Sequence, residues 1–165
     1  MDKLTQARLR ALLHYDPETG VFRWLVATGR RVKAGQEAGC LMPSGYVGIR
    51  IDNRRYMAHR LAWLYMTGEW PTGEIDHING RRTINEWRNL RVATSAENKA
   101  NARTPSHNTS GHKGVTFHKR RGKWAAQIHV NGKHIALGLF DNKEDAAAAY
   151  WRAARERFGQ FARAA

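Results

Sequence analysis

Apolar and polar residues alternate in short runs along the first half of the chain, and this pattern predicts short helices mixed with strands. Residues 4–15 (LTQARLRALLHY) carry Leu and Ala at the spacing of an amphipathic helix. The turn-forming run DPETG, residues 16–20, leads into a predicted strand at 21–26 (VFRWLV). Residues 45–51 (GYVGIRI) alternate as a strand, and residues 56–68 pass from a strand end into an apolar helix that a glycine closes.

In the second half the pattern predicts a short helix, a group of strands and one longer helix. Residues 94–102 (TSAENKANA) predict a helix with Thr94 or Ser95 as its N-cap. Three strand-like runs follow within 113–140, and a helix is predicted at 141–159, with its first aspartate as the cap. The simplest arrangement is a three-stranded antiparallel sheet with one helix across its back, in which Val115 and Phe117 face the core.

The elements predict an α+β fold divided by a linker. Residues 103–111 (RTPSHNTSG) are rich in residues that favour turns, so we place the linker there. We expect an N-terminal helix–strand region at 1–44, a second region of strands and a helix at 45–102, and a sheet-and-helix domain at 112–165.

The charge balance narrows the class of partner. The chain has 28 Lys and Arg against 14 Asp and Glu, a formal net charge of +14, and 42% of its residues are hydrophobic. That apolar content is too high for a disordered basic tail. A folded, strongly basic surface attracts polyanions, mainly nucleic acid and less often anionic membrane. Because the basic residues are spread along the whole chain, we expect a long footprint on a phosphate backbone.

The cysteine content and the absence of apolar stretches point to a cytoplasmic protein that is not secreted. Cys40 is the one cysteine, so the chain cannot form an internal disulfide, and we expect no structural zinc site. We expect Cys40 to be a small buried or half-buried residue. No apolar run approaches transmembrane length, and the first residues lack the apolar core of a signal peptide. We therefore expect no membrane partner.

A group of polar residues around EIDHINGRRTINEWRNL (74–90) suggests hydrolytic chemistry. Asp76 and His77 end a strand-like segment, and Asn98 lies on the helix predicted after the next strand. Two oxygen ligands, one charged and one neutral, suit a hard divalent cation that keeps several waters. A neutral histidine beside that ion can take a proton from water, since an unperturbed imidazole titrates at about 6.5. The residue types and their order fit metal-assisted hydrolysis of a phosphodiester.

The same residues carry a family resemblance. DHINGRRTINEWRNLRVATSAENKAN resembles the His-Asn-His (HNH) nuclease motif of phage and mobile-element endonucleases, in the subgroup where asparagine replaces the final histidine. The match covers roughly residues 45–102 and implies a ββα-metal finger with one divalent ion, Mg²⁺ or Mn²⁺. It implies that His77 is the general base, that Asp76 and Asn98 are the metal ligands, and that Asn89 braces the loop and orients the base.

Basic residues near this motif are candidate phosphate contacts, namely Arg60, Arg81, Arg82 and Arg91. Arg81, Arg82 and Ile84 depart from residues common in the family, which affects the expected substrate preference and rate more than activity itself. For His59, in the run HRLAW, packing is the favoured interpretation over catalysis.

Residues 111–161 resemble the plant APETALA/ethylene-response-factor DNA-binding domain through KGV, GKWAAQI, LGLF and EDAAAAYWRAA. That family lays a three-stranded sheet in the major groove. Strand alternation independently places polar residues on one face of the sheet, where Gln127 could pair with adenine. The candidate DNA contacts are Thr116, His118, Arg120, Arg121, Lys123, Gln127, His129 and Lys133. Several of these positions are arginine in the plant proteins, so the target sequence is not transferable.

The sequence therefore predicts a metal-dependent HNH endonuclease, a phosphodiester hydrolase that binds double-stranded DNA. One metal site per chain implies a nick per monomer, so a double-strand break would need a dimer or two events. The alternative is a non-catalytic DNA-binding protein, either a regulator or a packaging accessory, with a degenerate HNH fold. A further alternative is a nuclease specific for RNA or branched DNA. Homing, packaging and restriction roles fit the residues equally well.

Overall fold

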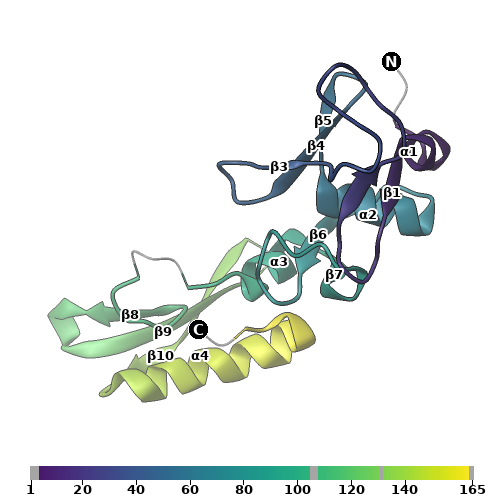
Figure 1. Ribbon diagram of the computed structural model, residues 1–165. Helices are drawn as coiled ribbons and strands as arrows, with labels where there is room; N and C mark the ends of the chain where they lie inside the picture. Colours follow the sequence, from purple (N-terminus) through teal and green to yellow (C-terminus); the bar gives the residue numbers. More distant parts are fainter. Residues whose placement is uncertain (1–3, 105–107, 131, 164–165) are drawn as a thin grey trace. The chain divides into compact units, whose positions relative to one another are not determined.

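The computed structural model describes residues 4–104, 108–130 and 132–163 and shows an α+β fold (Figure 1). Contacts between residues divide the chain into two compact units, residues 1–93 and residues 94–165. The predicted linker falls partly on residues 105–107, which lie outside the described part, as do the first three and last two residues of the predicted terminal regions. No helix among the described residues is long and apolar enough to cross a membrane.

The first unit begins with a helix and a short β-hairpin. Helix α1 (Gln6–Leu12) ends before strand β1 (Leu13–Tyr15), which pairs antiparallel with β2 (Phe22–Trp24) across the DPETG turn. The prediction of one helix over residues 4–15 is therefore wrong at its C-terminal end. Leu13 and Tyr15 are buried while His14 is exposed, and this period of two belongs to a strand.

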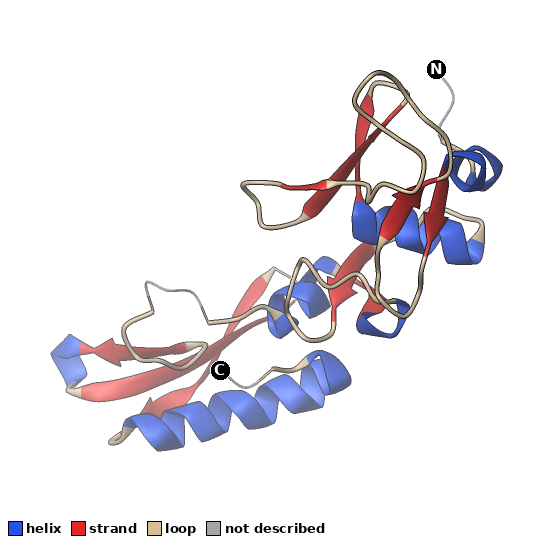
Figure 2. Cartoon of the chain, in the orientation of Figure 1, coloured by secondary structure: helices blue, strands red, loops and turns tan. Residues whose placement is uncertain are grey.

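A three-stranded antiparallel sheet follows, with β4 (Val47–Ile51) between β3 (Cys40–Leu41) and β5 (Arg54–Met57). Asp52 and Asn53 both have positive φ and make the tight turn between β4 and β5. Figure 2 shows these strands with the long loop that precedes them. The expectation that Cys40 is buried or half-buried is wrong, because it lies exposed on the short edge strand β3.

Helix α2 (Ala58–Thr67) supplies the centre of the hydrophobic core of the first unit. Gly68 ends it in the left-handed conformation, as predicted, and its N–H donates to the Leu64 carbonyl. Helix α2 packs against α1 and the strands β4 and β5. The largest fully buried side chains of this core are Tyr15, Phe22, Leu9, Leu13, Ile49, Ile51, Leu61 and Leu64.

The last sheet of the first unit is a two-stranded hairpin with a long connecting loop. Strand β6 (Glu74–His77) pairs antiparallel with β7 (Leu90–Ala93), and a 3₁₀ turn, η1 (Trp87–Asn89), leads into β7. The predicted strand after the loop is confirmed. This hairpin presents the Asp-His pair at one end.

The second unit begins with helix α3 (Ser95–Asn101). Thr94 is its N-cap, and a reciprocal capping box joins the Thr94 side chain to Glu97, in agreement with the sequence pattern. Within the unit, α3 packs against the C-terminal helix and the turn after it.

The predicted three-stranded sheet with one helix across it is confirmed, in the order β10 (Lys133–Phe140), β9 (Lys123–Val130), β8 (Val115–His118). The helix starts one residue later than expected, because Asn142 and not Asp141 caps it. Val115 is buried, but Phe117 is 49% exposed, with its ring 5.1 Å from that of Trp124, so its predicted burial is wrong. The elements are β8 (Val115–His118), η2 (Lys119–Arg121), β9 (Lys123–Val130), β10 (Lys133–Phe140), α4 (Lys143–Phe158) and η3 (Gly159–Phe161).

Candidate active site and nucleic-acid interface

Two polar neighbours, Asp76 and His77, are buried at the end of β6, with 3% and 4% of their surface exposed. The strand register sets Asp76 opposite Arg91 and His77 opposite Leu90. Since successive strand residues point to opposite faces, the two side chains have different surroundings. Each therefore needs its own polar partner to offset the loss of water.

The partner of Asp76 is Arg91. Nε of Arg91 donates to Oδ2 of Asp76 at 2.8 Å, and the two side chains are 13% and 4% exposed. In such a buried pair each charge compensates for the desolvation of the other. The structure thus engages Arg91, a predicted DNA contact, with the predicted metal ligand.

The ring of His77 is held by Asn85 in the loop between β6 and β7. Nε2 of His77 lies 3.1 Å from Oδ1 of Asn85. Burial lowers the pKa of His77 below its ordinary value, although the Asn85 hydrogen bond and the Asp76 charge act in the opposite direction. The imidazole is therefore neutral at neutral pH, which is the form that can accept a proton.

Two further rings enclose His77. His59 packs against it edge-on, with ring centroids 5.1 Å apart, and Tyr46 lies 6.0 Å from it. Burial, followed by the nearby His77 and Arg60, lowers the pKa of His59 to about 3. Nδ1 of His59 is buried and has no hydrogen-bond partner in the part of the chain that the structure describes. His59 is thus a neutral packing partner of His77.

Asn89 binds the loop and not the ring of His77. Its Oδ1 accepts from the backbone N–H of Asn79 at 3.0 Å, and its Nδ2 donates to Oδ1 of Asn79 and to the Ile84 carbonyl. Asn89 is 7% exposed, so these bonds are shielded from water. They join the two ends of the loop that carries Asn85.

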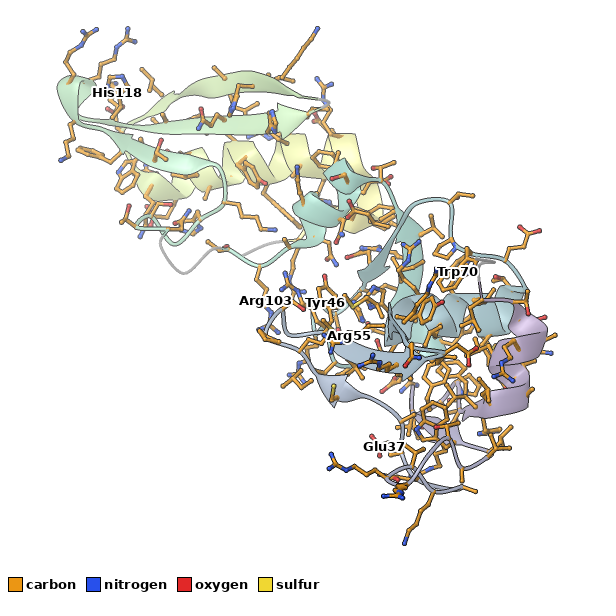
Figure 3. The ribbon with its side chains drawn as sticks, turned by 90° about the horizontal axis from the view of Figure 1, so that it is seen from above. Glu37, Tyr46, Arg55, Trp70, Arg103 and His118 are labelled. Carbon is orange, nitrogen blue, oxygen red and sulfur yellow. The ribbon has the colours of Figure 1, made fainter. Side chains whose placement is uncertain are left out.

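The other predicted arginines differ in their freedom to reach a phosphate. Nη1 of Arg60 donates to the Gly73 carbonyl at 3.1 Å, so that arginine braces the chain before β6. Arg82 donates to the Ser44 carbonyl at 2.9 Å, and its guanidinium lies 4.9 Å from the centre of the Tyr46 ring, a residue labelled in Figure 3. Arg81 is exposed and uses its backbone N–H to bind Asn79.

Asn98, the second predicted metal ligand, lies half-buried on α3 in the second unit. Within the first unit the structure brings together Asp76 with Arg91, and His77 with Asn85. The pairing of Asp76 with Arg91 and that of His77 with Asn85 were both absent from the sequence-based expectations.

The chemistry of the donor groups fits a hard divalent ion. Among the described residues there is no cluster of three or more His, Cys, Asp and Glu side chains. A buried carboxylate, that of Asp76, and a side-chain amide oxygen, that of Asn98, are hard oxygen donors of the kind that Mg²⁺ and Mn²⁺ accept together with water. Asp76 is ion-paired with Arg91.

Most of the predicted DNA contacts lie on the outer face of the C-terminal sheet or, as with Arg120 and Arg121, on the turn η2 between β8 and β9. Residues Thr116, His118, Arg120, Arg121, Gln127, His129 and Lys133 are all exposed. Lys123 is the exception, since it is half-buried and its Nζ lies 2.9 Å from a carboxylate oxygen of Asp141. Figure 3 shows nitrogen-tipped side chains projecting from the end of the sheet around His118. Ala126 and Ile128 are buried on the other face, as strand alternation predicts.

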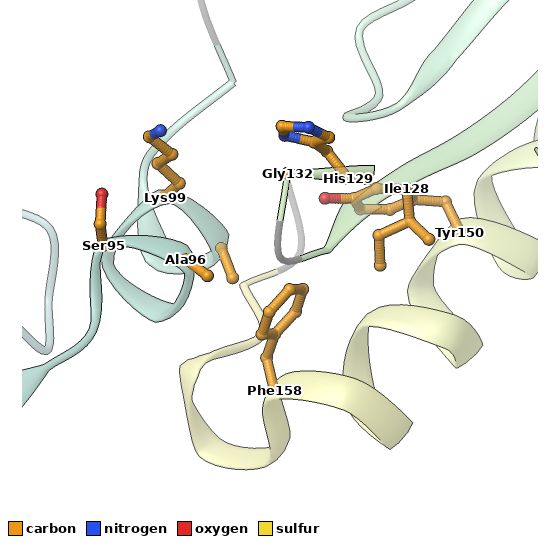
Figure 4. Close-up of a pocket in the computed structure, with 9 residues that line it drawn as sticks. Ser95, Ala96, Lys99, Ile128, His129, Gly132, Tyr150 and Phe158 are labelled. Atoms are coloured by element: carbon orange, nitrogen blue, oxygen red, sulfur yellow. The ribbon is translucent and has the colours of Figure 1, made fainter. Parts of the chain in front are cut away.

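A cavity of about 390 Å³ lies inside the second unit, between α3, the end of β9 and α4 (Figure 4). Lys99, His129 and Tyr150 are among its lining residues. None of the predicted catalytic or metal-binding residues belongs to the described lining of this cavity.

Two segments of the chain match known families. Residues 56–100 match the family described as HNH endonuclease, and residues 110–160 match the AP2 domain. The first segment contains Asp76, His77, Asn89 and Asn98, and the second contains the whole three-stranded sheet with α4.

Relatives are found for both segments. The chain is 40% identical over 106 residues to Protein 3.8 of Escherichia phage T7, covering 64% of this chain and 87% of the phage protein. It is 45% identical over 56 residues to the AP2-like ethylene-responsive transcription factor TOE2 of Arabidopsis thaliana, covering 34% of this chain and 12% of the plant protein. APETALA2-like protein 2 of Oryza sativa subsp. indica gives the same identity over 13% of its length.

The buried ion pair at Asp76 should matter far more for stability than an exposed one. We expect Arg91→Met to lower the free energy of unfolding by about 3–5 kcal/mol, because it leaves the Asp76 carboxylate buried without its partner. The matched control is Arg88→Met, which breaks the Arg88–Glu86 pair where the arginine is 76% exposed and should cost no more than about 1 kcal/mol. Urea denaturation followed by circular dichroism measures both, and equal losses would contradict the structural importance of the Asp76 pair.

The buried His59 should make the first unit sensitive to acid. Its pKa is lowered from 6.5 to about 3, so the unfolded chain binds a proton that the folded chain excludes, and stability present above about pH 6.5 is lost as pH falls toward 3. This single group contributes a slope of about 1.4 kcal/mol per pH unit. We expect His59→Gln to flatten the fall of unfolding free energy between pH 6.5 and 4, and the exposed control His14→Gln to leave it unchanged. A wild-type slope in His59→Gln would contradict the assignment.

Proposed function

The chain belongs to the HNH endonuclease family and carries an AP2 domain after the nuclease motif, and we propose that it is a metal-dependent DNA endonuclease. The observation that carries this proposal is the neutral, buried imidazole of His77 beside the Asp76–Arg91 pair. A histidine that stays neutral at neutral pH and is held in one orientation suits general-base catalysis.

The proposed reaction is hydrolysis of one phosphodiester bond. His77 takes a proton from the attacking water, and Asn89 keeps the loop around it folded through its bonds to Asn79 and Ile84. Asp76 and Asn98 would hold one divalent ion, Mg²⁺ or Mn²⁺. When bound, that ion stabilises charge on the phosphoryl oxygen and on the leaving 3′ oxygen.

The proposed target is double-stranded DNA, bound through the outer face of the β8–β9–β10 sheet. The match to the AP2 domain and the exposed polar face support this assignment. Gln127 is suited to a base edge in the major groove, and Arg120 and the other exposed basic residues are suited to phosphates. Tethering this sheet to the nuclease motif raises the local concentration of the site on its DNA.

We assign residues 1–44 and 45–102 to the nuclease part, residues 103–111 to the tether and residues 112–165 to DNA binding. One base and one metal site per chain imply that a monomer nicks one strand, and that a double-strand break needs a dimer or two events. The relative in Escherichia phage T7 supports action in the cytoplasm of a bacterial cell, and homing, packaging and restriction roles fit the proposed site equally well.

The activity can be tested on a supercoiled plasmid, or on the host or phage genome when a specific site is required. We expect Mg²⁺ or Mn²⁺ to support formation of nicked circles and EDTA to prevent it. Replacing His77 by alanine should slow cleavage by about 10²- to 10⁴-fold, since that is the usual contribution of a general base, and should leave DNA affinity unchanged.

The control is His14→Ala, which removes an exposed imidazole from the same unit and should cut at the wild-type rate. If DNA is shifted in a gel but never cut by the wild-type protein, the chain is a DNA-binding protein with a degenerate nuclease motif. If His77→Ala loses binding and cleavage to the same degree, His77 is not the base.

The sheet face can be tested through the salt dependence of binding. Removal of one phosphate contact lowers the slope of log affinity against log salt by about 0.9. We expect Arg120→Gln and Arg121→Gln each to show such a change in fluorescence anisotropy titrations with duplex DNA. Arg155→Gln removes the same charge from the exposed side of α4 and should leave the slope unchanged. Equal changes in all three variants would mean that the charge acts without a defined interface.

A further inference from the structure

Asn85 contacts the candidate base directly, although the sequence pattern gave it no role. It lies in the loop between β6 and β7 and is 3% exposed. A buried amide of this kind is retained only when its hydrogen-bonding groups have partners. Its Oδ1 lies 3.1 Å from Nε2 of His77, and its Nδ2 lies 3.3 Å from the Thr83 carbonyl oxygen.

These two contacts together determine where the proton of His77 sits. The Thr83 carbonyl can only accept a hydrogen bond, so the NH₂ end of the Asn85 amide must face it. The amide oxygen then faces the imidazole, and it too can only accept. In the neutral ring Nε2 therefore carries the hydrogen and donates to Asn85, and the lone pair that can accept a proton is on Nδ1.

Asn85 is itself held by the N-terminal β-hairpin. The hydroxyl of Tyr15 donates to the Asn85 carbonyl oxygen at 2.6 Å, in a buried bond between residues far apart in the chain. Burial raises the pKa of the Tyr15 hydroxyl, so it keeps its proton and can only donate to that carbonyl. The carbonyl of Pro17 accepts from the N–H of Trp87 at 2.8 Å, two residues beyond Asn85.

The turn of the hairpin packs directly on the same backbone. Gly20 has a φ of +72°, and a Cβ at this position would lie 2.3 Å from the carbonyl carbon of Asn85. Only glycine accommodates both that conformation and that approach. The segment that carries Asn85 is thus held by three contacts with the β1–β2 hairpin, made by Tyr15, Pro17 and Gly20.

We propose that Asn85 is the positioning residue of the catalytic base, and that the β1–β2 hairpin clamps Asn85 in place. The proposal rests on the proposed role of His77 as the base. Asn85 fixes the tautomer and the orientation of the His77 ring, so that Nδ1 is presented to water. Asn89 acts one step further away, since it ties the ends of the loop together.

A positioning partner of this kind changes the rate of the chemical step without contacting DNA. We expect Asn85→Ala to lower kcat by about 10- to 100-fold, by analogy with the loss found when a hydrogen-bond partner of a metal-binding histidine is removed. The KM for DNA should stay unchanged. Asn85→Asp keeps an oxygen that accepts from Nε2, so it should keep the Nε2–H tautomer, but its carboxylate cannot donate to the Thr83 carbonyl.

The direct test is long-range ¹H–¹⁵N NMR of the full chain with labelled histidine at pH 8, where both ring nitrogens report their protonation. The His77 signals are assigned by their absence from His77→Gln. We expect the wild-type ring to carry its hydrogen on Nε2 alone, and Asn85→Ala to show a mixture of the two tautomers. Tyr15→Phe, which removes one oxygen atom, should shift both the tautomer ratio and kcat in the same direction by a smaller amount.

The matched control is Tyr56→Phe, which removes a hydroxyl from a half-buried tyrosine of the same unit whose ring stacks on Trp70. It should leave tautomer and kcat unchanged. A single Nε2–H tautomer and a wild-type kcat in folded Asn85→Ala would overturn the proposal, and so would a wild-type ring carrying its hydrogen on Nδ1. The NMR measurement does not depend on cleavage, so it tests the contact between Asn85 and the His77 ring by itself. A wild-type protein that cuts no DNA would overturn the endonuclease assignment alone.

Discussion

The burial of four polar side chains at the end of a small hairpin is the constraint on which the nuclease part depends. Asp76, His77, Asn85 and Asn89 are each less than a tenth exposed, and a buried polar group destabilises the fold unless it is paired. The charge of Asp76 is compensated by Arg91, the His77 ring by Asn85, and Asn89 by the loop backbone. The hydrogen bonds and the ion pair that offset the desolvation of these four side chains also hold each of them in one orientation.

The N-terminal hairpin explains how the long loop between β6 and β7 keeps its shape. The loop between β6 and β7 has no regular structure except a single 3₁₀ turn, so its own hydrogen bonds would hold it weakly. Tyr15 and the DPETG turn supply outside contacts, and they are anchored in turn by the core around α2. The β1–β2 hairpin at the start of the chain therefore serves as a scaffold that holds the proposed catalytic loop in place.

The C-terminal sheet divides its two faces between packing and binding. Val115, Ala126 and Ala146 form a small buried apolar core between the sheet and α4, and partly buried larger side chains such as Trp124 and Tyr150 pack against it. The outer face is left to His, Gln, Thr and basic residues that have little to pack against. An exposed face that carries positive charge binds phosphates favourably. This agrees with the match to the AP2 domain and with the proposed binding of DNA by the sheet.

The sequence by itself determined the elements whose signals are local: the capping box at Thr94, the stop at Gly68, and the strands and helix of the C-terminal domain. It also singled out the Asp-His pair, because that signal is a short motif. Only the tertiary structure decided that the helix at the N-terminus gives way to a strand, that Arg91 pairs with Asp76, and that Asn85 holds His77. Local periodicity reports which face of an element is apolar, whereas these contacts depend on which distant segments burial brings together, and no spacing along the chain encodes that.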